Sequence, residues 1–286
     1  MSSTPTPTPT TRVHEFDSEA YALKGQWNRP LKHEHKPHHH VKLPKEGGYF
    51  HEHGETYRFN GLLSYGAAYT QVAGNRSLKP GLGWVTLATS VIEDFNILNV
   101  VTADRIVGLI STEYPLEGYV PSVTFLGTRF ENLRIAGHPV HVEMNPDIFG
   151  DRPAGDATYG ADAGFRSRVN EQRDRILKGG NLPDEIAGRY NRLPQTAKAE
   201  ETIECSLVQR VEGSFPGRVH GHAIDIPHFG KLYLGVVRLE QTTYTTTTGV
   251  HPKFTFELTM IEAKMGCIGD GQLGSGGGKT NGNTKP

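Results

Sequence analysis

The sequence predicts a mainly β protein: an antiparallel β-sandwich or related barrel with a short helical insertion. Three observations carry this prediction. Apolar residues alternate with polar ones in several segments, 34 Gly and 18 Pro favour turns over long helices, and one segment has helical spacing. The 286 residues suit one main domain, because single β domains often extend to about 200 to 250 residues.

We expect both ends of the chain to be disordered tails. Residues 1–11 are a Thr-Pro repeat, and residues 269–286 are rich in glycine. Neither segment carries enough apolar surface to offset the entropy cost of ordering it.

Residues 12–56 are polar and rich in histidine, and we expect them to form an N-terminal arm on the surface. Its anchors would be the large apolar side chains Phe16, Tyr21, Leu23 and Trp27. The β-sandwich domain then covers residues 57–268.

Strand patterning is clearest near the end of that domain. Phe254, Phe256, Leu258 and Met260 alternate with polar residues, as in a strand with one face toward water. Gly249 and Pro252 separate residues 231–248 from residues 253–264, so these two runs are predicted to form a hairpin.

The helical insertion is predicted over about residues 162–190. Phe165, Val169 and Ile176 fit one helical face, Asp162 can cap its start and two glycines end it near residue 180. A second short helix is expected from Pro183, which suits a first helical turn.

Three short runs carry a resemblance to a known family. They read TADRI at 102–106, VTFLGT at 123–128 and FENLRIAG at 130–137. They resemble the choice-of-anchor P type of bacterial surface-associated domain, in which an Ala-Asp step precedes a strand that ends in a glycine turn. The resemblance covers roughly residues 85–145. It implies a β-sandwich and brings no catalytic residues.

Charge and apolar patterning exclude several partners. A net charge of −1 provides no broad field to hold nucleic acid, and no apolar run approaches the roughly 18 residues of a membrane span. Residues 1–11 lack the apolar centre of a signal peptide, so a cytoplasmic location is the default. A surface or extracellular location would need a removed leader or another export route. A bridge between Cys205 and Cys267 stays open.

Histidines are the most unusual feature, with 14 in the chain. Five lie within residues 33–40, in an expected flexible loop that could bind Zn, Ni or Cu. On a strand, His51, His53 and Glu55 would project to one side, as in a two-histidine, one-carboxylate metal site. The alternative is an exposed strand edge.

His220 and His222 form another candidate pair. They share a strand face with Ile224 and Ile226, so they are either core residues or ligands at the mouth of a pocket. Together with His51, His53 and Glu55 they could hold a divalent transition metal such as Zn, provided that their strands are neighbours.

Three functions remain open. The first is a non-catalytic binding or structural protein, with self-assembly through a β-edge such as the threonine run at 242–248, because nucleophile-elbow, P-loop and zinc-protease motifs are missing. The second is a metal-binding protein or metal-dependent enzyme. The third is a carbohydrate-binding module, for which the candidate rings are Trp84, Tyr65, Tyr69 and Tyr119.

Overall fold

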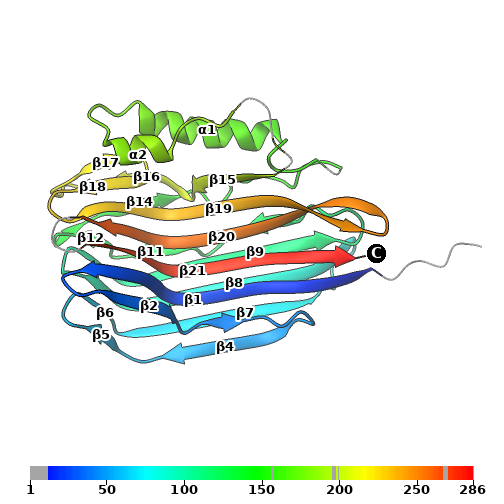
Figure 1. Ribbon diagram of the computed structural model, residues 1–286, viewed down its shortest axis with the longest axis horizontal. Helices are drawn as coiled ribbons and strands as arrows, with labels where there is room; N and C mark the ends of the chain where they lie inside the picture. Colours follow the sequence, from blue (N-terminus) through cyan, green and yellow to red (C-terminus); the bar gives the residue numbers. More distant parts are fainter. Residues whose placement is uncertain (1–11, 156, 195–197, 199, 267–269, 286) are drawn as a thin grey trace, which may run out of the picture.

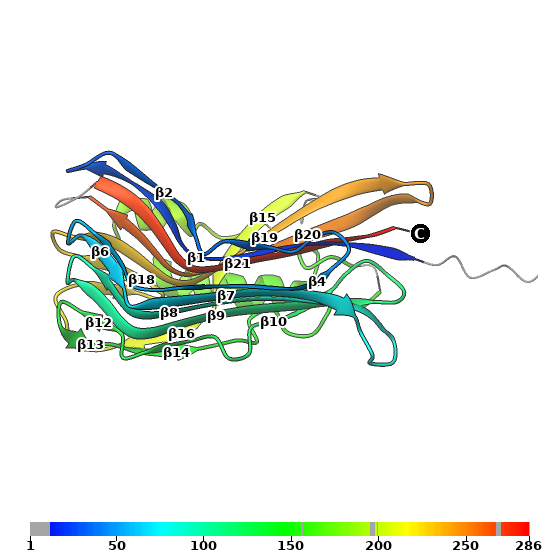
Figure 2. The ribbon, with the colours of Figure 1, turned by 90° about the horizontal axis from the view of Figure 1, so that it is seen from below.

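The computed structural model describes residues 12–155, 157–194, 198, 200–266 and 270–285. Two large antiparallel sheets, sheet A and sheet B, lie face to face around the hydrophobic core (Figures 1 and 2). Neither sheet closes into a barrel in this part of the chain, so the predicted sandwich is confirmed. Within the same residues, no helix is both long and apolar enough to cross a membrane.

Sheet A has nine strands and includes the predicted hairpin. In spatial order they are β17 (Arg218–His220), β18 (Ala223–Ile226), β19 (Gly230–Thr246), β20 (Gly249–Met265), β21 (Asp270–Lys285), β1 (Val13–Arg29) and β2 (His33–His38), with β15 (Glu201–Ser206) on β19 and β3 (Val41–Lys42) on β1. The long hairpin of β19 and β20 confirms the pairing expected from the alternation of residues 253–260.

Sheet B has ten strands, and most lie in the first half of the chain. They are β4 (Gly48–Gly54), β5 (Tyr57–Phe59), β6 (Leu63–Tyr65), β7 (Ala67–Arg76), β8 (Leu82–Ile97), β9 (Val101–Pro115), β10 (Ser122–Thr124), β11 (Arg129–Glu131), β12 (Arg134–Ile135) and β13 (His138–Pro139). The centre of the sheet is the β7–β8–β9 meander, and β4 pairs with β7 at one margin.

The helical insertion lies where the sequence predicts it. It follows β14 (His141–Met144), which pairs with β16 (Val208–Glu212) in a small separate sheet. Asp162 caps the start of helix α1 (Ala163–Leu177), and its side chain accepts a hydrogen bond from the backbone N–H of Phe165 at 2.6 Å. Helix α2 (Asp184–Arg189) follows Pro183.

Two segment predictions are wrong. The glycine-rich C-terminal segment forms β21, which pairs with β20 on one side and β1 on the other. The expected surface arm starts with β1, an interior strand of sheet A in which Leu23 and Trp27 are fully buried. Backbone hydrogen bonds on both sides order β21, whose single apolar side chain is the buried Leu273. Residues 1–11 and Cys267 lie outside the described residues, so the predicted tail and the predicted bridge stay predictions.

Sheet A bends sharply near the middle of its long strands, and its concave side faces away from sheet B (Figure 2). Near the middle of these strands the pairing leaves out one position in each of β19, β20, β21 and β1: Gly235, Met260, Gly276 and Ala22. Gly235 and Gly276 have φ angles of +57° and +64°, a region that favours glycine.

Sheets A and B approach each other closely at the bend and diverge beyond it. At the bend, Ser90 Oγ of β8 donates a hydrogen bond to the backbone oxygen of Tyr21 at 3.0 Å. Away from it, large buried side chains fill the widening space, with Trp27 toward one end and Phe254 and Phe256 toward the other. The bend therefore produces a concave outer surface on sheet A.

Candidate functional site

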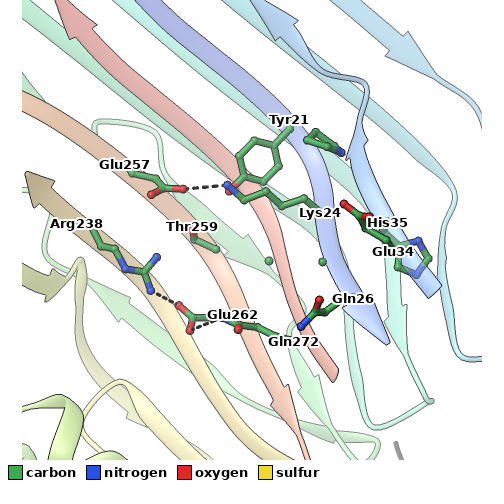
Figure 3. A pocket seen from close by; sticks show the side chains of 13 residues that line it. Tyr21, Lys24, Gln26, Glu34, His35, Arg238, Glu257, Thr259, Glu262 and Gln272 are labelled. Atoms are coloured by element: carbon green, nitrogen blue, oxygen red, sulfur yellow. Dashed lines mark hydrogen bonds and ion pairs between the residues drawn. The ribbon is translucent and has the colours of Figure 1, made fainter. Parts of the chain in front are cut away.

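The concave outer face of sheet A contains a cavity of about 390 Å³, here named the trough (Figure 3). It crosses five strands. Its lining residues are Tyr21, Lys24, Gly25 and Gln26 of β1, Glu34, His35 and Pro37 of β2, Arg238 of β19, Glu257, Thr259 and Glu262 of β20, and Gln272 and Gly274 of β21.

The trough is hollow because β21 places glycines on its floor. A Cβ atom at Gly274 would lie 3.4 Å from Thr259 Cγ2 and 4.0 Å from the backbone oxygen of Lys24, both ordinary contacts, so space is open above it. At Gly277 the ring of Tyr21 lies across the strand, since a Cβ there would come within 2.0 Å of the ring. The glycines of β21, whose sequence gives no hydropathy pattern, thus shape the site.

Lys24 joins two strands across β21. Its Nζ atom lies 3.1 Å from Glu257 Oε1 and 4.2 Å from the centroid of the Tyr21 ring (Figure 3). Burial favours the neutral amine, but the Tyr21 hydroxyl and the Glu257 carboxylate outweigh it and raise the pKa of Lys24. The ammonium group is therefore fixed and charged.

Glu262 is the centre of a cluster of alternating charges at the other wall. It accepts two hydrogen bonds of 2.8 Å from Arg189 and one of 2.7 Å from Arg238, and its side chain is 4% exposed. Glu204 Oε1 and Oε2 bind the same two arginines at 2.5 and 2.9 Å. Burial opposes ionisation of Glu262, but the arginines outweigh it and lower the pKa of its carboxyl.

His35 lies at the β2 wall of the trough (Figure 3). Its Nδ1 atom is 3.2 Å from the hydroxyl of Tyr57, and its buried Nε2 atom has no hydrogen-bond partner within the described residues. Burial, with the neighbouring His33 and His38, lowers the pKa of His35 to about 4. The imidazole is therefore neutral at pH 7.

The histidines of residues 33–40 belong to a packed structure, and the expectation of a flexible loop is wrong. β2 begins at His33, and the rings of His33 and His35 are 4.6 Å apart. The His38 ring is 4.4 Å from Tyr57, and the Tyr65 hydroxyl bonds His39 Nε2 at 3.0 Å. The imidazole rings of these residues therefore pack against other rings and form hydrogen bonds within the protein.

The candidate metal residues of the early chain lie at the margin of sheet B. His51 and His53 are exposed on β4, and Glu55 is exposed just beyond its end. His53 faces Tyr69 on β7, and the His51 ring lies 6.2 Å from the Tyr69 ring. This is the exposed strand edge that the sequence left as the alternative.

His220 ends β17 of sheet A and His222 lies in the turn that leads to β18, at the opposite side of the molecule from β4 (Figure 1). His222 is fully buried and its Nε2 atom is 2.7 Å from the Tyr190 hydroxyl, as expected for a core histidine. The combined site with His51, His53 and Glu55 is wrong, because the strands are not neighbours. Within the described residues, no group of three or more His, Cys, Asp or Glu side chains could hold a metal.

The rings proposed for carbohydrate binding do not share a surface. Trp84 is buried and stacks on His14 at 5.1 Å, and Tyr65 is 2% exposed. Tyr69 is on sheet B, and Tyr119 stacks on His251 at 3.9 Å. Sequence reasoning missed Lys24, Glu257 and Glu262. The wet face of the strand at 253–260 pointed to Glu257, but only the pairing of distant strands brings Lys24 beside it.

Comparison with known proteins gives a family and no named activity. No curated protein and no solved structure matched the chain. A family model described as "Domain of unknown function (DUF8256)" matches residues 14–240, which is most of both sheets and the whole helical insertion. This match does not bear on the choice-of-anchor P resemblance, which stays a prediction. The chain belongs to the DUF8256 family.

Proposed function

We propose that this protein is a non-catalytic binding protein whose trough holds a hydroxyl-rich ligand, namely a saccharide chain. The observation that carries the proposal is a groove with a glycine floor and walls of fixed polar groups that crosses five strands. Neighbouring strands are about 4.8 Å apart, so the groove is long enough for several sugar rings.

The polar groups of the trough suit hydroxyls. Each sugar hydroxyl both donates and accepts hydrogen bonds, and the trough offers amides, carboxylates and an ammonium side by side. Gln26 and Glu34 form no side-chain hydrogen bond or ion pair with the rest of the described chain, so they are free to bind a ligand.

The charge state of the trough favours binding over proton transfer or covalent catalysis. The lowered pKa of Glu262 keeps it ionised, so it does not suit the role of general acid. The raised pKa of Lys24 keeps it protonated, so it does not suit the role of nucleophile. Ion pairs hold Lys24 and Glu262 in place as charged groups that can form hydrogen bonds with a ligand.

Affinity electrophoresis tests the proposal. The full chain would be run through gels that contain xylan, laminarin or dextran as neutral polymers, or alginate as an acidic one. We expect at least one neutral polymer to slow the protein. Unchanged mobility in every gel would contradict the proposal. Release of reducing ends from a polymer would show that the protein hydrolyses the polymer, which would contradict a non-catalytic role.

A matched pair of variants locates the ligand. Gly274→Trp fills the trough at a position where a side chain causes no backbone clash, and should weaken binding at least tenfold. Lys285→Trp changes an exposed residue at the end of the same strand, opposite Val13 and away from the trough, and should leave binding unchanged. Equal binding by both variants would exclude the trough as the site.

A further inference from the structure

β4 is the marginal strand of sheet B and, in the described part of the chain, pairs with β7 alone. Figure 1 shows it along the edge of the molecule. The edge of β4 that faces away from β7 therefore presents backbone N–H and C=O groups that a further strand could bind.

This edge lacks the lysine and proline that commonly block strand addition. β2, at the edge of sheet A, contains Lys36 and Pro37, whereas β4 reads GYFHEHG and contains neither lysine nor proline. Tyr49 and Phe50, on opposite faces of β4, are 54% and 43% exposed. An unblocked edge with exposed rings on both faces is suited to pairing.

We infer that two copies of this chain pair through β4 as an antiparallel, two-fold symmetric dimer, which joins the two B sheets into one. Pairing all seven residues of the strand places the axis at its middle residue, His51. Tyr49 then faces the partner's His53, and Phe50 faces the partner's Glu52.

The strand is self-complementary in this register. Within one chain, the rings of Tyr49 and Tyr69 lie 5.5 and 6.2 Å from the ring of His51 and form a row on the outer face of sheet B. The second copy extends this row across the axis, with rings opposite rings. Glu52 is the one carboxylate of β4; it lies 3.6 Å from His39 Nδ1 of its own chain and meets no second carboxylate across the axis. The continuous row of rings favours a second copy over an unrelated strand.

Light scattering of the full chain over a wide range of concentration is the first test. We expect the mass of two chains at high concentration and of one chain on dilution. A single-chain mass at every concentration would overturn the inference.

Charge substitution at the axis then tests the register. Cross-strand partners have Cβ atoms about 5 Å apart, so His51→Glu alone or His51→Lys alone places like charges together and should give monomers. An equimolar mixture should recover dimers, since opposite charges then meet. Dimers in either single variant, or monomers in the mixture of folded variants, would overturn the pairing.

Two controls separate the interface from general damage. His138 is exposed on β13, at the other margin of the same sheet, and the matching His138→Glu and His138→Lys variants should remain dimeric. With Cys267 changed to Ser, His51→Cys should form a disulfide between chains on oxidation, whereas Glu52→Cys should not. Crosslinking at residue 52 and not at residue 51 would contradict the predicted register.

Discussion

At the residue scale, Glu262 is the group on which the wall of the trough depends. Two arginines bind its carboxylate, and all three side chains are mostly removed from water. Such a cluster is stable only while its charges balance, because a buried charge without its partner keeps its desolvation cost. The cluster joins α2 to strands β19 and β20, so it also fixes the helical insertion on sheet A.

Glu262→Gln should lower the free energy of unfolding by about 3–5 kcal/mol, because it leaves Arg189 and Arg238 with one carboxylate between them. Urea unfolding followed by circular dichroism measures the loss. Glu131→Gln is the matched control, since Glu131 pairs with Arg129 at 2.7 Å on an exposed surface and should cost less than about 1 kcal/mol. Similar losses in both variants would contradict the special role of the cluster.

His222 gives the fold a dependence on pH. Burial, with the nearby charge of Arg189, lowers the pKa of His222 to about 3, whereas an unfolded histidine titrates near 6.5. Below about pH 6.5 the unfolded chain binds a proton that the folded chain does not. Stability is therefore greatest above that pH and is lost as the pH falls toward 3, by at most about 1.4 kcal/mol per pH unit for this group.

His222→Leu should be less stable than the wild type at pH 7, because the Tyr190 hydroxyl loses its partner, and should depend less steeply on pH between 6.5 and 4. Urea unfolding at several pH values gives both quantities. His138→Leu, at an exposed position, should keep the wild-type slope. An unchanged slope in the His222 variant would show that this residue is not buried as a neutral imidazole.

At the scale of elements, the bend of sheet A depends on Gly276 of β21. Its φ angle is +64°, and an added Cβ would lie 2.9 Å from Met260 Cβ. Gly276→Ala should therefore cost about 1–3 kcal/mol. Gly274→Ala, two residues away and free of such contacts, should change stability by less than about 1 kcal/mol. Equal urea midpoints for the two variants would exclude strain at the bend.

The sequence predicts correctly the elements whose own residues show a hydropathy or capping pattern. Alternation identified the hairpin of β19 and β20, and spacing with a capping Asp162 identified α1. β21 is the opposite case, because glycines contribute no hydropathy pattern and its order comes from β1 and β20. Likewise, alternation predicts which face of its strand His53 or His220 occupies. It does not predict the pairing of distant strands, which places the two residues in different sheets.

At the scale of the whole molecule, sheet A is assembled from both ends of the chain. β1 and β21 pair along almost their full length, from Val13 with Lys285 to Arg29 with Asp270. β21 is also the sole link between β1 and the β19–β20 hairpin in the strand order of the described residues. The floor of the trough therefore exists only when the last strand is in place.

Removing β21 by ending the chain at Gly266 should abolish the folded state, although the sequence alone suggests a dispensable tail. The truncation leaves two unpaired edges in the middle of sheet A and uncovers Ala88 and Ile110 of sheet B, which β21 covers. We expect loss of the near-ultraviolet circular dichroism signal and of a cooperative thermal transition. A truncated chain that kept both would show that sheet A closes without β21, and the bend and the trough would then need another explanation.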